Sequence, residues 1–258
     1  MSEPAFPRVN VLGVGISAIN LQEAVGEIER WIAQGEPHYV DVCTVQTVME
    51  CRKAPRLRQL VNDSGMATPD GMPLVWLSRL RGHRSAGRVY GPDLMLALCE
   101  RSRTTKHRHF FYGGGPGVAD LLARKLQARH PGLVVAGTHT PPLRPIDADE
   151  DRAVVDAINA AAPDIVWVGL GTPKQDYFVA RHRARLRAPA LIAVGAAFDF
   201  HAGVLRQAPR WMQRSGLEWL FRLAQEPRRL AYRYLVYNPL FLWNVALQAV
   251  GLRTYRLE

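Results

Sequence analysis

Apolar and polar positions follow two different periods along the chain. Short apolar runs rich in Val, Ile, Phe and Tyr are typical of buried strands, and apolar residues three or four positions apart are typical of amphipathic helices. Strands are predicted at 9–12, 39–43, 109–112, 133–138, 165–168 and 190–194. Helices are predicted at 21–32, 45–61, 92–101, 117–129, 149–161 and 174–186. Because strands and helices take turns, the pattern predicts an α/β fold with a mainly parallel, Rossmann-like sheet and flanking helices.

The composition changes near residue 206. Residues 206–258 hold 9 Arg, 3 Glu and no Lys, together with 9 of the 22 aromatic residues of the chain. This segment therefore contributes +6 of the net charge of +10. We expect two domains: an α/β core at 1–205, and a basic, aromatic-rich helical appendage at 206–258, broken at Pro227 and Pro239.

The charge balance favours a partner that carries negative charge. The chain has 33 basic and 23 acidic residues, and 29 of the basic ones are Arg. Nucleic acid, a phosphorylated small molecule and an anionic membrane surface all fit this balance. Arg offers a planar fork of donors that matches phosphate oxygens, although a codon bias toward Arg explains part of the count equally well.

The three cysteines indicate neither a disulfide framework nor a structural zinc site. Cys43, Cys51 and Cys99 form an odd set without C-x-x-C spacing. We expect reduced, buried thiols, as in the cytoplasm. No apolar run approaches the length that spans a bilayer.

A first glycine turn, Gly13-x-Gly15-x-x-Ala18, follows a predicted strand and precedes a predicted helix. This is the outline of a dinucleotide-binding turn, and it raises the alternative of an NAD-dependent enzyme. The helix is predicted to begin only after Asn20, its expected cap, which is too late to hold a phosphate at its N-terminus. A tight strand-to-helix turn is the preferred interpretation.

Two later loops also leave a strand and enter a helix. Gly113 and Gly114 begin a glycine-rich loop whose backbone N–H groups could receive a nucleotide phosphate or ribose, the alternative being a wide turn. In the second loop, Gly171 precedes Lys174, Gln175 and Asp176. The side chains of the first helical turn there are expected at the carboxyl edge of the sheet, where open α/β sheets bind ligands.

Two acidic segments are candidates for chemistry. Asp147-Ala-Asp149 resembles the metal-binding D-x-D of some sugar transferases, but acidic residues at a helix N-terminus explain it more simply. Asp70 lies in a turn between Pro69 and Gly71. A carboxylate held rigidly there is either a turn cap or a general base.

Seven segments, taken together and in order, resemble the WecG/TagA/CpsF family of bacterial glycosyltransferases of surface-polysaccharide and teichoic-acid synthesis. The segments are Thr68-Pro-Asp-Gly-Met, Arg88-Val-Tyr-Gly-Pro-Asp-Leu94, Phe111-Tyr-Gly-Gly-Gly, Val168-Gly-Leu-Gly-Thr-Pro-Lys-Gln-Asp176, Val194-Gly-Ala-Ala-Phe-Asp-Phe-His-Ala-Gly203, Ala208-Pro-Arg-Trp211 and Gly216-Leu-Glu-Trp-Leu-Phe-Arg-Leu-Ala-Gln-Glu-Pro-Arg228. The resemblance covers about residues 9–235.

This resemblance implies an inverting, metal-independent transfer of a sugar from a UDP-sugar. The acceptor it implies is a saccharide linked through diphosphate to a polyprenyl lipid, and no cofactor is expected. It also implies that the appendage closes the active site at the membrane. The enzyme would thus be cytoplasmic and peripherally associated with the inner face of the cell membrane.

The family's functional residues carry over one by one. Asp70 matches the proposed catalytic base, and Arg88 matches the basic residue before the Gly-x-Asp-Leu motif. Thr44 and Gln175 match residues that line the sugar pocket. Arg222 and Arg229 match the appendage arginines thought to hold the diphosphate.

Two positions depart from the family pattern. Gln46 stands where the family often has Asn. Because the longer side chain can reshape the sugar pocket, the donor sugar can be N-acetylmannosamine, its uronic acid or glucose. Asp176 replaces the usual Glu, with the same charge on a shorter side chain.

The chemistry of an inverting transfer fits these residues. A single carboxylate is enough to take the proton of the attacking hydroxyl, and fixed donors can stabilise the departing UDP in place of a cation. Arg222 and Arg229 are seven positions apart, hence on one helical face if Pro227 only kinks the helix, and Arg233 extends that stripe. A solvated basic face is the alternative.

Aromatic residues interleave with Arg in the appendage, which suits an anionic membrane surface. Packing of these rings on the core or on another subunit is the alternative, and it makes a homo-oligomer possible. A basic nucleic-acid-binding module is a further alternative, but no recognition motif supports nucleic acid as a partner.

Overall fold

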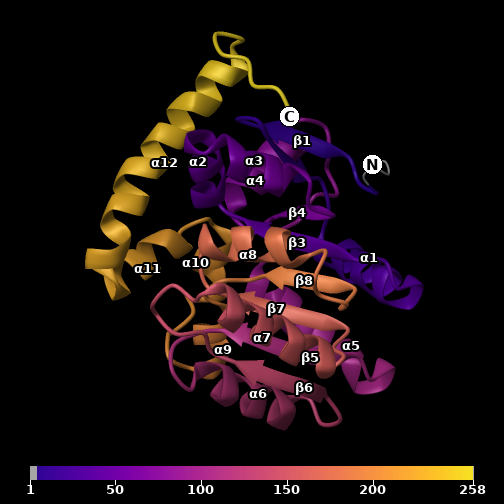
Figure 1. The fold of residues 1–258 in the computed structure, drawn as a ribbon. Helices are drawn as coiled ribbons and strands as arrows, with labels where there is room; N and C mark the ends of the chain where they lie inside the picture. Colours follow the sequence, from indigo (N-terminus) through magenta and orange to yellow (C-terminus); the bar gives the residue numbers. More distant parts are fainter. Residues whose placement is uncertain (1–4, 258) are drawn as a thin grey trace. The chain divides into compact units, whose positions relative to one another are not determined.

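A computed structural model describes residues 5–257 of the chain (Figure 1). The described residues form two compact units. The first contains the segment up to Leu21, Val42–Tyr90 and the segment from Gln207 onward. The second contains Gln22–Asp41 and Gly91–Arg206. The division of the chain into a core at 1–205 and an appendage at 206–258 stays a prediction.

The sheet has six strands in the order β4-β3-β8-β7-β5-β6. Strand β3 (His38–Cys43) passes from the second unit into the first after Asp41, and β4 (Met66–Pro69) belongs to the first. The remaining strands of this sheet are β5 (Arg108–Gly113), β6 (Val134–His139), β7 (Ile165–Gly169) and β8 (Ala190–Ala193). The pairs β3–β8, β8–β7, β7–β5 and β5–β6 are parallel, which confirms the predicted fold class.

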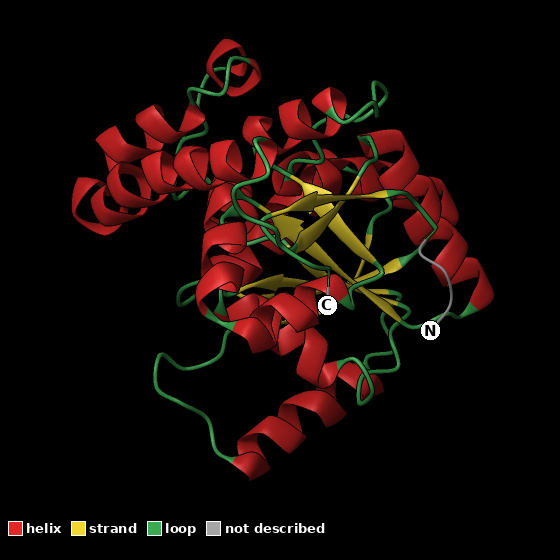
Figure 2. Cartoon of the chain, turned by 90° about the horizontal axis from the view of Figure 1, so that it is seen from above, coloured by secondary structure: helices red, strands yellow, loops and turns green. Residues whose placement is uncertain are grey.

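In the second unit, helices cover both faces of the strands (Figure 2). Side chains that alternate along β5 show why: Phe110 and Tyr112 pack in one buried cluster with residues of two helices, whereas Phe111 meets Phe198 on the other face. The helices of this unit are α1 (Leu21–Gln34), α5 (Gly91–Thr105), α6 (Val118–Arg129), α7 (Ala148–Ala160), α8 (Lys174–His182) and α9 (Ala197–Ala202). Of these, α7 and α8 contribute to the cluster around Phe110, and α9 carries Phe198.

The first unit begins with an antiparallel hairpin, β1 (Arg8–Val11) and β2 (Val14–Ser17). Leu12 and Gly13 turn the chain at positive φ, of 54° and 89°, as a two-residue hairpin turn requires. The prediction of a strand-to-helix turn at Gly13–Ala18 is therefore wrong. Its residues form the second strand of a hairpin, because alternating apolar residues on both sides of the turn allow the two strands to pair.

The first unit also holds the helices α2 (Val45–Lys53), α3 (Pro55–Asn62), α4 (Met72–Leu80), α10 (Arg210–Arg214), α11 (Glu218–Gln225) and α12 (Pro227–Ala249). The predicted helix at 45–61 is interrupted at Ala54, since the residue before Pro55 is kept out of the helical region. The predicted break at Pro227 is confirmed by the gap between α11 and α12.

The predicted break at Pro239 is wrong, because α12 continues through it. Its buried residues recur three or four positions apart on both sides of the proline, so tertiary packing holds one continuous helix. These residues are Leu230, Tyr234, Tyr237, Phe241 and Asn244. Pro239 itself is exposed, where water can satisfy the carbonyl group it leaves without a donor. Within residues 5–257, no helix is long and apolar enough to cross a membrane.

Candidate active site

Asp70 follows β4 at the point where three segments of the first unit meet. Its backbone N–H donates to Cys43 O at 2.9 Å, at the end of β3. Val89 N donates to Pro69 O at 2.9 Å, which places the segment around Arg88 beside the end of β4. Backbone hydrogen bonds of Asp70 and of the preceding Pro69 therefore hold the turn that carries the Asp70 carboxylate, as expected.

Arg88 is the main partner of this carboxylate. Its Nη2 lies 2.9 Å from Asp70 Oδ1, and its Nε also donates to the backbone oxygen of Asp70. The guanidinium lies 3.9 Å above the ring of Tyr90, which fixes its plane. Burial raises the pKa of Asp70 to about 6, against the opposing effect of Arg88. A carboxylate with such a pKa is a suitable proton acceptor near neutral pH.

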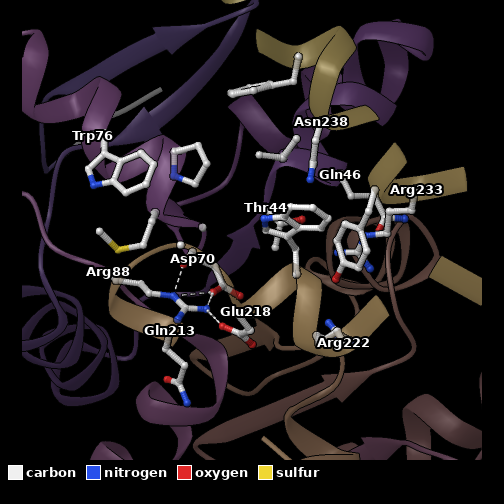
Figure 3. A pocket seen from close by; sticks show the side chains of 18 of the residues that line it. Thr44, Gln46, Asp70, Trp76, Arg88, Gln213, Glu218, Arg222, Arg233 and Asn238 are labelled. Carbon is white, nitrogen blue, oxygen red and sulfur yellow. Dashed lines mark hydrogen bonds and ion pairs between the residues drawn. The ribbon is translucent and has the colours of Figure 1, made fainter. Parts of the chain in front are cut away.

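Glu218, in the first turn of α11, binds the same arginine. Its Oε2 accepts from Arg88 Nη2 at 2.5 Å, and its Oε1 accepts from the Tyr90 hydroxyl at 2.8 Å. Figure 3 shows Asp70, Arg88 and Glu218 joined in this order. Glu218 and Tyr90 lie within two of the family segments, but they were not predicted as site residues, because their importance arises from this contact between distant segments.

These groups open into a cavity of about 320 Å³ that is lined by residues of the first unit alone. Four of the predicted site residues beside Asp70 lie on it: Thr44, Gln46, Arg88 and Arg222. Its apolar wall consists mainly of Met72, Pro73, Trp76, Trp219, Phe241 and Leu242. The cavity thus combines two carboxylates, those of Asp70 and Glu218, with a group of arginines and a large apolar surface.

The N-terminus of α2 faces this cavity. Thr44 caps the helix, with its hydroxyl accepting from Thr47 N and its own N–H donating to Thr47 Oγ1 at 3.1 Å. Thr44, Val45 and Gln46 all line the cavity. The partial positive charge of a helix N-terminus favours an anionic ligand there.

Two arginines add full positive charge to the same cavity. Arg222 on α11 is 13% exposed in its side chain, and Arg233 on α12 contributes a buried Nε that has no hydrogen-bond partner. Burial lowers the pKa of Arg233. Figure 3 shows both guanidinium groups directed at the cavity.

Arg229 is placed differently from Arg222. The helix breaks at Glu226, so the two arginines lie on different helices, and the expectation of one shared helical face is wrong. Arg229 is 58% exposed, is paired with Glu226 at 2.5 Å and is absent from the cavity lining. Glu226, the residue before Pro227, has a non-helical backbone that ends α11. Arg229 therefore belongs to a new helix and points in a different direction from Arg222.

The other six predicted site residues belong to the second unit. Gly113 allows a close approach of β5 to β7, because a Cβ there would lie 2.5 Å from Gly169 O, and Gly114 N donates to the same oxygen at 2.9 Å. Gln175 is buried and accepts from Gly171 N at 3.0 Å. Lys174 is exposed, and Asp176 is buried. Their roles in substrate binding stay predictions.

The Asp147-Ala-Asp149 segment caps a helix. Asp147 Oδ1 accepts from the N–H groups of Asp149 and Glu150 at 3.0 and 2.8 Å. In turn, Glu150 Oε2 accepts from Asp147 N at 3.1 Å. The preferred interpretation of this segment is confirmed. In the part of the chain that the structure describes, no group of three or more His, Cys, Asp and Glu side chains could hold a metal ion.

The fold is of the α/β class, and the cavity holds a largely buried carboxylate beside several arginines. A comparison with protein families makes the class specific: residues 9–255 match the model of the Glycosyl transferase WecG/TagA/CpsF family, and the chain belongs to that family. It is a glycosyltransferase.

Three similar proteins share the name N-acetylglucosaminyldiphosphoundecaprenol N-acetyl-beta-D-mannosaminyltransferase. The protein of Bacillus subtilis (strain 168) is 30% identical over 203 residues, 75% of this chain and 77% of that protein. The protein of Bacillus spizizenii is 28% identical over 199 residues, 77% and 76% of the two chains. The protein of Staphylococcus aureus (strain MW2) is 24% identical over 241 residues, 93% and 92% of the two chains.

Proposed function

We propose that the enzyme transfers a hexosyl unit from a UDP-sugar to a saccharide linked through diphosphate to a polyprenyl lipid, with inversion at the anomeric carbon. N-acetylmannosamine is the preferred donor sugar, since the relatives are named for it; its uronic acid and glucose are the alternatives that Gln46 leaves open. The observation that carries the proposal is the Asp70 carboxylate, buried beside Arg88 in a cavity that also holds Arg222 and Arg233.

In this proposal Asp70 acts as the general base. A single in-line displacement needs one group that accepts the proton of the acceptor hydroxyl, and the Asp70 pKa of about 6 leaves the carboxylate ionised at neutral pH. Arg88 holds the carboxylate in place through Nη2 and Nε. The ionised carboxylate then accepts the proton as the hydroxyl attacks.

The departing diphosphate is stabilised by fixed positive groups. Arg222, Arg233 and the N-terminus of α2 line one cavity, and their charges are in place before the substrate arrives. Bidentate guanidinium–phosphate pairs are strong and directional. We infer that this arrangement supports the reaction without a metal ion.

The apolar surface of the first unit suits a lipid-linked acceptor. Trp76 lines the cavity and is 45% exposed, and Leu235 and Trp243 on α12 are 61% and 63% exposed. No charged residue occurs between Arg233 and Arg253. We infer that this face associates peripherally with an anionic membrane surface on the cytoplasmic side. A homo-oligomer stays a prediction.

A donor panel tests the proposed function. UDP release is measured with UDP-activated N-acetylmannosamine, N-acetylmannosaminuronic acid and glucose, a polyprenyl-diphosphate N-acetylglucosamine analogue, and excess chelator. The expected result is turnover that requires the acceptor and persists with chelator, and NMR of the product gives the anomeric configuration. Turnover that stops with chelator and returns with a divalent cation would refute the metal-free mechanism. No turnover of any donor with the diphosphate-linked acceptor would refute the proposed substrates.

A further inference from the structure

We propose that Glu218 is a positioning residue for this reaction: it shares the Arg88 guanidinium with Asp70, and so prevents Arg88 from neutralising the base while it holds α11 at the cavity. The inference rests on the proposed role of Asp70. It adds a residue for which neither the sequence motifs nor the comparisons suggest a role.

The sharing takes place at one nitrogen atom. Arg88 Nη2 lies 2.9 Å from Asp70 Oδ1 and 2.5 Å from Glu218 Oε2. All three side chains are at most 17% exposed, so water screens these charges poorly. The shorter contact belongs to Glu218, which takes much of the Arg88 charge that would otherwise stabilise ionised Asp70.

The same carboxylate fixes the helix that carries a cavity arginine. Glu218 and Arg222 are four positions apart on α11, hence on one face of it. With Oε1 bound to the Tyr90 hydroxyl at 2.8 Å and Oε2 bound to Arg88, the first turn of α11 is held at two points. Losing this carboxylate would free the turn that places Arg222 in the cavity.

The charged and titratable groups around Asp70 make the direction of the effect clear. Burial raises its pKa, Arg88 and Arg222 lower it, and Glu218 raises it again. Tyr90 and Arg233 also interact with the Asp70 charge. Without the negative charge of Glu218, only burial opposes the effect of the arginines on Asp70, so the pKa of Asp70 falls and it becomes a weaker base.

Glu218→Gln removes the charge together with the hydrogen bond from Arg88, because the amide oxygen can still accept from Tyr90 whereas the amide nitrogen cannot accept from Arg88. We expect the acid limb of the kcat/KM profile to move by about one pH unit to lower pH, the size of shift that one nearby charge produces. We expect kcat on the plateau to fall about threefold or more, since a weaker base accepts the proton less readily. A limb that stays at the parent's pH would overturn the proposal.

Two comparison variants separate charge from geometry. Tyr90→Phe removes one hydrogen bond of Glu218 and keeps its charge, so the acid limb should stay in place. Glu29→Gln removes a carboxylate that pairs with Arg101 at 2.8 Å in the second unit, and its pH profile should match the parent's. Glu218→Ala removes both contacts and should weaken UDP binding about tenfold or more. UDP affinity equal to the parent's would show that Glu218 does not hold α11.

A measurement without substrate keeps this inference separate from the proposed function. The side-chain carboxyl of Asp70 is titrated by carbon-13 NMR in protein labelled at aspartate, with Asp70→Asn assigning the signal. Glu218→Gln should lower the pKa measured for Asp70, and an unchanged pKa overturns the inference. If Asp70→Asn keeps full turnover while Glu218 still shifts the Asp70 titration, the base assignment fails and the coupling of the two carboxylates stands.

Discussion

The hydroxyl of Tyr237 on α12 accepts a hydrogen bond from Lys53 on α2 at 2.7 Å. The same hydroxyl donates to Glu50 Oε1 at 2.7 Å, and the Lys53 ammonium lies 4.4 Å from the centre of the Tyr237 ring. One phenol thus ties α12 to the helix whose first turn lines the cavity.

Replacing this phenol tests how strongly the two helices depend on it. Tyr237→Phe should lower the free energy of unfolding by about 1–2 kcal/mol, since two charge-assisted hydrogen bonds are lost and their partners return to water. Urea denaturation measures the change. Tyr232→Phe, at a ring that is 63% exposed, is the matched control and should have little effect. Equal stability of the two variants would show that Tyr237 does not stabilise the contact between α12 and α2.

Asp70→Asn should abolish turnover and leave UDP binding nearly intact. The amide keeps the size of the side chain but cannot accept a proton, and removal of a general base costs about 10²–10⁴-fold in rate. Turnover is followed by UDP release, and UDP affinity by calorimetry. Residual activity equal to the parent's would refute the base assignment.

The arginines should differ in their effect on UDP affinity. Arg222→Ala and Arg233→Ala should each raise the UDP dissociation constant by about tenfold or more, because each removes a charge that lines the cavity. Arg229→Ala should change it much less, as Arg229 is exposed and paired with Glu226. A dominant effect of Arg229 would place the diphosphate elsewhere.

Asp70 should also give the protein a characteristic dependence of stability on pH. Its pKa is raised from 3.8 to about 6, so between these values the folded protein holds a proton that the unfolded chain has released. Relative to Asp70→Asn, the parent should therefore lose stability as the pH rises through about 6. The difference between the two proteins should change by on the order of 3 kcal/mol between about pH 3.5 and about pH 8, measured by urea denaturation at each pH. A constant difference would show that burial does not perturb this carboxyl.

The exposed apolar face of α12 should contribute to membrane binding. Leu235→Ser with Trp243→Ser should reduce sedimentation with anionic liposomes, because both side chains are mostly exposed. Leu143→Ser is the control, since Leu143 is 92% exposed and lies in the second unit. Point variants are preferable to deletion of the appendage, because Tyr237 and Phe241 are buried in the first unit. Sedimentation unaffected by the double substitution would exclude this face as the anchor.

Periodicity and motifs predicted the α/β class because parallel strands buried on both faces leave nearly continuous apolar runs, as in β7 and β8. Hairpin β1–β2 was missed, since Gly13-x-Gly15 occurs equally in a hairpin and in a strand-to-helix turn. The break at Pro227 was predicted, but its effect on the placement of Arg222 and Arg229 was not, because that effect depends on the backbone conformation of Glu226. The sequence left open whether Arg233 belongs to a phosphate-binding stripe or to a solvated face, because helical spacing does not show which side of the helix is buried.

The site was predictable only where a local motif contains the residue. Asp70 and Arg88 lie in two of the recognisable segments, Thr44 matches a sugar-pocket position of the family, and all three line the cavity. The residues that modify them, Glu218 and Tyr90, act through a contact between positions 128 residues apart. No local pattern encodes such a pairing.

The cavity wall joins residues 44–90 with residues 213–242, and the whole of 91–206 is synthesised between them. During translation, Asp70 therefore leaves the ribosome well before the helices that complete the cavity around it. Until those helices emerge, the apolar wall around Met72 and Trp76 lacks the residues that complete it, and transiently exposed apolar surface of this kind favours aggregation.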